Sequence, residues 1–188
     1  GQMLQKFCPP DVRVINLAVG GRSTRSFVAE KRWEKLLAQL SPGDLVLIQF
    51  GHNDQKKDSP ERYAPADGSY QEYLKRFIAD VRERKGEVVL CTPVARRIFD
   101  GAKVRNTLGG YPEAVRKVGA ETGTPVIDLY NATVAALEKY GPEKSAELFY
   151  VTPEQQPDRT HFNRAGAELV AGEVARALKE KQLPAPRE

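Results

Sequence analysis

Two histidines are the only imidazole side chains in this chain, and each stands in a segment rich in polar residues. His52 lies in the sequence Gly-His-Asn-Asp at 51–54, and His161 follows Asp158 by three residues. Histidine is the side chain that titrates near pH 7 without perturbation, so it is the expected general base. A carboxylate that orients the imidazole forms the acid–base half of a hydrolytic triad. We therefore predict that Asp158 and His161 are catalytic and that His52 has a supporting role.

Two short segments have residue types that can stabilise a developing oxyanion. Gly20 and Gly21 end one apolar run and precede a helical pattern, where a glycine N–H can approach a ligand closely. Asn53 follows the next apolar run, and a rigidly held amide at such a place can donate to an oxyanion. A strand-to-helix turn at the glycines and an Asx-turn at Asn53 are the structural alternatives. The spacing does not match the dinucleotide-binding Gly-x-Gly-x-x-Gly motif.

The sequence favours no metal centre. The acid–base pair would need further ligands, and Asp54 or Asp128 is the nearest candidate, but no helical spacing supports such a set. Cys8 and Cys91 lack the number and spacing of a zinc site or a disulfide framework. We expect no metal ligands.

Alternating strand and helix patterns predict an α/β fold with a parallel sheet and helices on both faces. The strands are expected in four apolar runs rich in β-branched residues, namely Val12–Ala18, Asp44–Phe50, Glu87–Pro93 and Pro125–Leu129. The helices are expected at Thr24–Leu40, from an N-cap at Ser69 to about Val81, from about Pro112, and at Arg164–Lys181 behind an Asn163 cap.

Two loops follow carboxyl ends of predicted strands, where open α/β sheets bind ligands. They span Gln55–Gly68 and Val94–Gly110, and we expect them to form the walls of a substrate site.

Length and composition fit one globular domain over residues 1–188. The chain has 40% apolar and 29% charged residues, and Lys plus Arg exceed Asp plus Glu by only 29 to 25. A nucleic-acid site needs clustered positive charge, whereas the excess here is scattered over amphipathic stretches. No apolar window has the length of a membrane span. We therefore expect neither a nucleic-acid nor a membrane partner.

Taken together, the motifs resemble the SGNH or GDSL hydrolase superfamily, most closely its rhamnogalacturonan acetylesterase-like branch. The resemblance covers nearly the whole chain and rests on the order of Gly-Gly-Arg-Ser at 20–23, Gly-His-Asn-Asp at 51–54 and the pair Asp158 and His161. Thr107–Pro112 and Thr160–Asn163 are also similar to this branch. The resemblance implies a three-layer α/β/α, flavodoxin-like fold. It assigns Gly21 and Asn53 to the oxyanion hole and requires no cofactor.

The family's nucleophile is the serine of a Gly-Asp-Ser block on the first strand, and these 188 residues contain no such block. The resemblance places that serine and strand before residue 1. Three explanations follow: an N-terminal segment that precedes this sequence, a second chain that supplies the strand, or a pseudoenzyme. Ser23 and Ser26 are expected to cap a helix rather than to replace the nucleophile.

The resemblance implies a serine esterase that removes acetyl groups from carbohydrate, with a pectin- or rhamnogalacturonan-derived oligosaccharide as the expected substrate. Arg22 and Arg159 are the predicted substrate contacts, with Arg96 and Arg97 as further candidates. Two alternatives stay open at this point. One is a carbohydrate-binding pseudoenzyme without a nucleophile, and the other is a flavodoxin-like ligand module that uses the turn at Gly20 and Gly21.

Overall fold

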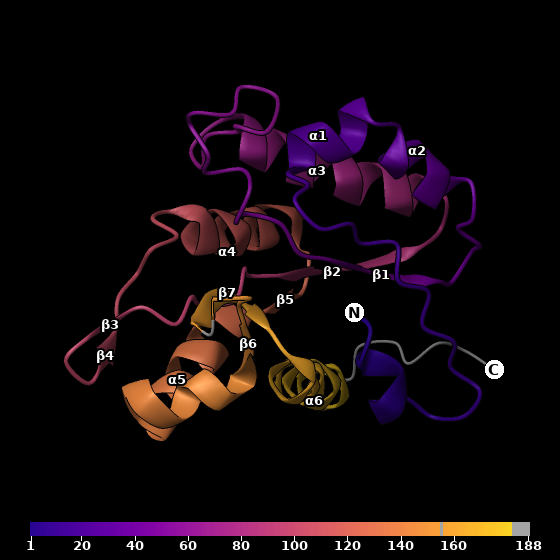
Figure 1. The fold of residues 1–188 in the computed structure, drawn as a ribbon. Helices are drawn as coiled ribbons and strands as arrows, with labels where there is room; N and C mark the ends of the chain where they lie inside the picture. The colour runs from indigo at the N-terminus through magenta and orange to yellow at the C-terminus, as the bar shows by residue number, and fades with distance from the viewer. Residues whose placement is uncertain (155, 182–188) are drawn as a thin grey trace. The chain divides into compact units, whose positions relative to one another are not determined.

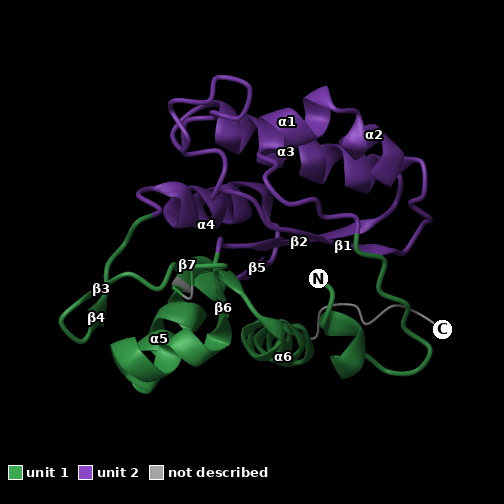
Figure 2. Cartoon of the chain, in the orientation of Figure 1, with its two compact units in different colours: residues 1–16, 94–107, 129–183 green, residues 17–93, 108–128, 184–188 purple. Residues whose placement is uncertain are grey.

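The computed structural model describes residues 1–154 and 156–181, and the chain divides into two compact units (Figure 2). Of the described residues, unit 1 contains 1–16, 94–107 and 129–181, and unit 2 contains 17–93 and 108–128. The single domain over residues 1–188 stays a prediction.

A parallel three-stranded sheet forms the centre of unit 2. Its strands are β1 (Leu45–Ile48), β2 (Glu87–Cys91) and β5 (Val126–Ile127), in the order β1-β2-β5. Leu45 pairs with Glu87, and Cys91 pairs with Ile127. Residues 88–91 of the central strand are all buried, as their unbroken apolar run indicated. Three of the four predicted strands and the α/β fold with a parallel sheet are thus confirmed.

The fourth predicted strand, Val12–Ala18, is wrong, because residues 12–18 form no strand. A β-strand requires partners for its backbone hydrogen bonds, and here a side chain takes that role for part of the segment. The Gln5 amide donates to the Val12 carbonyl oxygen at 2.7 Å and accepts from the Val14 N–H at 2.8 Å. The apolar composition of the run was therefore insufficient, since Ile15 is 55% exposed.

Four helices of unit 2 lie on one side of its sheet (Figure 1). They are α1 (Thr24–Ala29), α2 (Arg32–Leu37), α3 (Ser69–Glu83) and α4 (Tyr111–Thr122). The predicted continuous helix at 24–40 is broken because Lys31 has left-handed backbone angles, with φ 56°. The predicted Ser69 N-cap is also wrong: the helix begins at Ser69, and Gly68 holds the cap position without a side-chain bond.

Aromatic side chains fill the space between these helices and the sheet. Trp33 is 1% exposed, packs against Phe77 with ring centroids 4.1 Å apart, and donates its indole N–H to Asp80 at 2.7 Å. Tyr70 stacks edge-on against Tyr111 at 5.0 Å. The segment that follows β1 also packs against this apolar core, through Phe50, Ala64 and Ala66.

Unit 1 contains two helices, α5 (Leu129–Lys144) and α6 (Arg164–Glu180). The predicted last helix and its cap are confirmed, since the Asn163 side chain accepts the Gly166 N–H at 3.1 Å. Helix α5 was not predicted, and it kinks at Gly141, where φ is 77°, directly before Pro142. Two 3₁₀ turns, η1 (Leu4–Phe7) and η2 (Ser145–Leu148), complete its helical elements.

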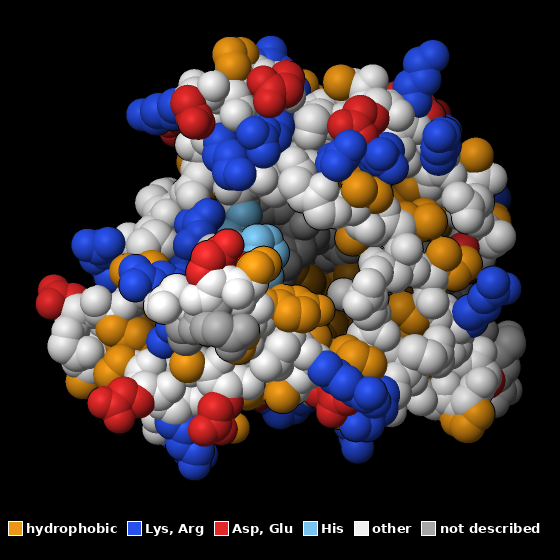
Figure 3. Space-filling model, viewed as in Figure 1, with side chains coloured by type: hydrophobic (Ala, Val, Ile, Leu, Met, Phe, Trp, Pro, Cys, Tyr) orange, Lys and Arg blue, Asp and Glu red, His pale blue; other side chains and the backbone are white. Residues whose placement is uncertain are grey.

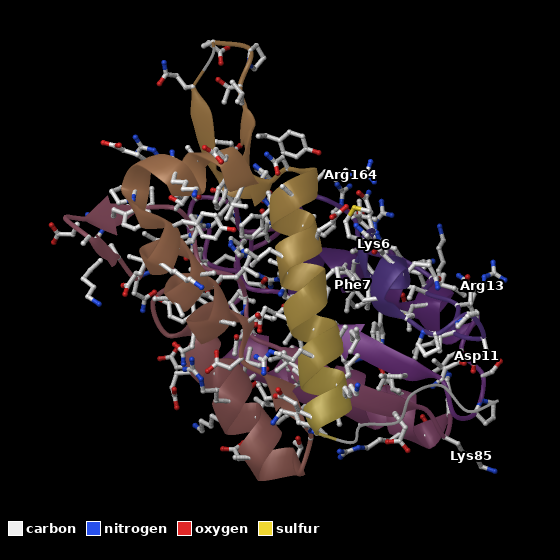
Figure 4. All side chains as sticks on the ribbon, turned by 90° about the horizontal axis from the view of Figure 1, so that it is seen from below. Lys6, Phe7, Asp11, Arg13, Lys85 and Arg164 are labelled. Carbon is white, nitrogen blue, oxygen red and sulfur yellow. The ribbon has the colours of Figure 1, made fainter. Side chains whose placement is uncertain are left out.

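Turn η1 packs along α6 at the edge of unit 1. Figure 4 shows Lys6 and Phe7 beside this helix, with Arg164 at its start. Lys6 Nζ lies 2.9 Å from Glu168 Oε2, and a Cβ added at Gly172 would meet the Phe7 ring at 3.6 Å. The Phe7 ring therefore packs at van der Waals distance from the helix at this position.

Two antiparallel hairpins in unit 1 were not predicted. One joins β3 (Phe99–Asp100) to β4 (Lys103–Val104), within the segment expected to be a loop at 94–110. The other joins β6 (Phe149–Val151) to β7 (Pro157–Phe162). In the second, Phe149 pairs with Phe162 and Val151 with Pro157, so residues 158–161 bulge out of the ladder. This bulge contains the predicted acid and base.

Candidate active site

The turn at Gly20-Gly21-Arg22-Ser23 leads directly into α1 of unit 2. Gly21 has φ 79°, a backbone conformation that favours glycine, and a Cβ added there would meet nothing within 4 Å. Ser23 caps the helix: its hydroxyl accepts the Ser26 N–H at 3.1 Å, and Ser26 Oγ accepts the Ser23 N–H at 2.9 Å. Both serines are buried, as expected of structural caps. The side of the Gly21 Cα where a side chain would stand is therefore open.

The turn at Gly51-His52-Asn53-Asp54 follows β1 in the same unit. Gly51 has φ 132°, and an added Cβ would lie 3.0 Å from Pro93 Cγ, so only glycine fits this position. The Asn53 amide donates to the Arg22 carbonyl oxygen at 3.3 Å. The structure therefore brings the two predicted oxyanion segments together within unit 2.

Asp54 joins the same two turns and was not predicted to do so. Its side chain is fully buried, and Oδ1 accepts from the Thr24 N–H at 2.9 Å and from the Thr24 hydroxyl at 2.5 Å. Oδ2 accepts the Gly51 N–H at 3.0 Å. Burial raises the pKa of Asp54 to about 6, although these hydrogen bonds act in the opposite direction. The pattern of the sequence gave no sign of a contact between residues 24 and 54.

The predicted acid and base form a hydrogen-bonded pair in unit 1. Asp158 Oδ2 lies 2.9 Å from His161 Nδ1, and Oδ1 accepts the backbone N–H groups of Thr160 and His161, the latter at 2.8 Å. Partial burial opposes ionisation of Asp158, but the hydrogen bonds from the His161 ring and from the two backbone groups lower its pKa to about 2. The ionised carboxylate fixes the proton of His161 on Nδ1, which leaves Nε2 as the accepting nitrogen. The imidazole side chain is 73% exposed and can meet a substrate.

The two arginines predicted to bind substrate differ in their surroundings. Arg22 Nε lies 3.0 Å from Glu30 Oε2, and its Nη1 donates to the Gly20 carbonyl oxygen at 3.0 Å. These contacts hold the guanidinium over its own turn. Arg159 is exposed and, among the described residues, its guanidinium forms no ion pair. Its backbone oxygen accepts the Arg97 N–H at 2.8 Å, which ties the bulge to the segment at 94–107.

Positive side chains are interspersed with negative ones on the face shown in Figure 3. Exposed arginines form ion pairs along helices, as Arg176 does with Glu173 and Glu180 at 2.7 Å each. No group of three or more His, Cys, Asp or Glu side chains within residues 1–154 and 156–181 is arranged to hold a metal ion. No described helix is both long and apolar enough to cross a membrane. The absence of a nucleic-acid partner stays a prediction.

Comparison with known proteins identifies the family. A model of the GDSL-like lipase/acylhydrolase family matches residues 1–169. The chain belongs to this family. The resemblance drawn from the sequence motifs is thereby confirmed.

Relatives of this GDSL-like chain come from Bacillus subtilis (strain 168). The probable rhamnogalacturonan acetylesterase YesY is 38% identical over 184 residues, which cover 98% of this chain and 84% of YesY. The rhamnogalacturonan acetylesterase RhgT is 39% identical over 193 residues, which cover 98% of this chain and 82% of RhgT.

A crystal structure of the YxiM protein from B. subtilis has a TM-score of 0.86 and 26% identity, and the match covers 99% of this chain. The chain spans about half of YxiM, 51% of its length.

The described residues of this GDSL-like chain contain two groups whose chemistry suits ester hydrolysis. Unit 2 contains two coupled turns with an N–H and an amide that can bind an oxyanion, and unit 1 contains an oriented acid–base pair. Their combination in one active site stays a prediction from the sequence.

Proposed function

We propose that this chain acts as a carbohydrate acetylesterase that uses a serine nucleophile. The observation that carries the proposal is the hydrogen bond of 2.9 Å between Asp158 and His161, with the accepting nitrogen on an exposed ring. Two relatives with about 38% identity that are named as rhamnogalacturonan acetylesterases support the substrate class. An acetylated oligosaccharide derived from rhamnogalacturonan is the proposed substrate.

In the proposed reaction, His161 Nε2 accepts the proton of the serine hydroxyl while the serine oxygen attacks the carbonyl carbon of the acetyl ester. The Gly21 N–H and the Asn53 amide hold the resulting oxyanion. When the tetrahedral intermediate collapses, the bond to the sugar oxygen breaks, and His161 gives its proton to that oxygen. Water then attacks the acetyl-serine, and the same proton transfers release acetate. Asp158 stabilises the imidazolium in both halves.

The proposed nucleophile is a serine on a further strand that pairs with the outer edge of β1, from a preceding segment or from a second chain. Val46 and Ile48 of β1 are buried, yet no strand among the described residues pairs with that edge. An unpaired edge beside buried side chains supports the addition of a strand there. Labelling of the active protein with a fluorophosphonate, followed by peptide mapping, tests this. The label should fall in a Gly-Asp-Ser peptide, and a label on Ser23 or Ser26 would refute it.

Arg159 is the proposed contact to the carboxylate of a uronate residue in the substrate. Its exposed guanidinium and its position next to Asp158 support this role. Arg22 is proposed to act mainly by holding the Gly21 turn, because Glu30 already engages its charge.

Release of acetate from acetylated rhamnogalacturonan oligosaccharide, together with hydrolysis of p-nitrophenyl acetate, tests the proposed function. His161→Ala and Asp158→Asn should each abolish most of the activity, while Asp100→Asn, an exposed aspartate of unit 1, should leave it unchanged. Activity that survives His161→Ala would refute the mechanism. Binding of the oligosaccharide without any hydrolysis would instead favour a carbohydrate-binding protein.

A further inference from the structure

The buried carboxylate of Asp54 has no part in the proton transfers proposed above. It lies in unit 2 with hydrogen bonds to two segments that are 27 residues apart, counted from Thr24 to Gly51. No Lys or Arg among the described residues forms an ion pair with it, so its charge is compensated by N–H and O–H groups. Burying a carboxylate costs free energy unless hydrogen bonds compensate it, and these three bonds do so.

Capping of α1 explains only part of this arrangement. Ser23 accepts the Ser26 N–H, and Ser26 Oγ accepts the Ser23 N–H, but this capping box leaves the Thr24 N–H without an intrahelical partner. Asp54 Oδ1 accepts that N–H together with the Thr24 hydroxyl, and its other oxygen accepts the Gly51 N–H outside the helix. Through these bonds, Asp54 links Thr24, the first residue of the helix, to the turn at 51–54.

The two residues that Asp54 links, Thr24 and Gly51, lie close in sequence to the two proposed oxyanion donors. Thr24 is three residues after Gly21, and Gly51 is two residues before Asn53. The bond between the Asn53 amide and the Arg22 carbonyl oxygen is longer, at 3.3 Å, and engages one of the two N–H groups of that amide. The short bonds of Asp54 consequently set the spacing between the turns more firmly than the Asn53 bond does.

Two tyrosine hydroxyls bind backbone groups near Asp54. The Tyr70 hydroxyl donates to the Phe50 carbonyl oxygen at 3.1 Å, and the Tyr111 hydroxyl donates to the Ala64 carbonyl oxygen at 2.8 Å. Ala64 in turn donates its N–H to the Asp54 carbonyl oxygen at 3.0 Å. The backbone of Asp54 is therefore also held by a hydrogen bond.

We propose that Asp54 is the positioning residue of the oxyanion hole, and that its single carboxylate sets the separation between the Gly21 N–H and the Asn53 amide. The proposal has two parts. Its catalytic part rests on the proposed esterase function, whereas its structural part concerns only the two turns of unit 2. Asp54 itself touches neither substrate nor the reacting atoms.

Amide hydrogen exchange tests the structural half in Asp54→Ala and Asp54→Asn. Exchange should accelerate at residues 20–24 and 51–53 in the alanine variant, and to a smaller extent in the asparagine variant, which keeps one oxygen acceptor. The matched control is Asp80→Ala, which removes the acceptor of the Trp33 N–H in the same unit. It should lower the melting temperature without selective exchange at those two turns. Unchanged exchange there in Asp54→Ala would overturn the proposal.

Steady-state hydrolysis of p-nitrophenyl acetate, measured well below each melting temperature, tests the catalytic half. Asp54→Ala should lower kcat about 10- to 100-fold with KM changed by less than about threefold, since loss of one oxyanion donor costs about 10²- to 10³-fold. Asp54→Asn should recover part of kcat, and Asp80→Ala should keep kcat within about twofold. A folded Asp54→Ala variant with wild-type kcat would overturn the inference. A protein that contains the proposed serine strand and shows no hydrolysis would refute the proposed function, while the exchange experiment still decides whether Asp54 holds the turns.

Discussion

Replacing Gly51 by alanine should destabilise unit 2 much more than the same change at another glycine with positive φ. A φ of 132° lies outside the conformations that residues with a side chain normally adopt. Alanine at this position would therefore be strained by about 1–3 kcal/mol. The new Cβ would also lie 3.0 Å from Pro93 Cγ and 3.3 Å from Pro93 Cβ, atoms of a rigid ring. Overpacking of this kind costs about 1–3 kcal/mol. A gain of about 0.4–1 kcal/mol from the stiffer unfolded chain offsets part of this, which leaves about 2–5 kcal/mol.

Gly123→Ala is the matched control for this prediction. Gly123 belongs to the same unit and has φ 60°, but an added Cβ there would meet nothing within 4 Å. Its cost should be only about 1 kcal/mol, the price of a left-handed conformation. The contrast between the two variants isolates the special geometry at Gly51.

Urea unfolding followed by the fluorescence of Trp33 measures both costs, because this is the one tryptophan of the chain and it is buried in unit 2. At about 2–4 °C per kcal/mol, Gly51→Ala should lower the melting temperature by about 5–15 °C. Equal stability of the two variants would refute the reasoning, since the contact with Pro93 would then have no energetic effect.

Three further predictions concern the proposed catalytic groups and the positioning residue Asp54. Asn53→Ala should lower kcat about 10²- to 10³-fold in ester hydrolysis with little change in melting temperature, and an effect on KM alone would contradict its role as an oxyanion donor. Asp158→Asn should remove about 1 kcal/mol of stability at pH 7, after allowance for solvent screening. Because the pKa of Asp158 is lowered from 3.8 to about 2, this loss should vanish as the pH falls through 2 in denaturant titrations, and a loss that does not depend on pH would count against it. The pKa of Asp54 is raised to about 6, so the wild type should lose about 2–3 kcal/mol relative to Asp54→Asn as the pH rises from 3.8 through 6. Parallel pH–stability curves for those two proteins would show that Asp54 does not titrate in this range.

Elements with strong periodicity could be predicted from the sequence. The apolar repeats of α3 are buried as expected at Tyr70, Leu74, Phe77, Ile78 and Val81, and the strands at 45–48 and 87–91 lie within their apolar runs. In this helix and these strands, the pattern of apolar side chains along the element indicates which face is buried. The short pair Asp158 and His161 could also be predicted, because its geometry depends on residues three positions apart.

Elements that depend on distant partners could not be predicted. The run at 12–18 has the composition of a strand, but the Gln5 side chain takes two of its backbone groups. The ladder of β6 and β7 is interrupted by a bulge, so it shows no alternation of apolar and polar residues. The role of Asp54 depends on a contact with Thr24 across 30 positions, for which a single sequence contains no signal.

The bulge at 158–161 makes the orientation of the His161 ring a local property of the chain. One oxygen of Asp158 accepts the backbone N–H groups of Thr160 and His161, and the other oxygen binds the His161 ring. The contacts that set the tautomer of His161 thus lie within four consecutive residues. Because Nδ1 is bound to Asp158, the ring presents Nε2 as the acceptor to any hydroxyl group that reaches it.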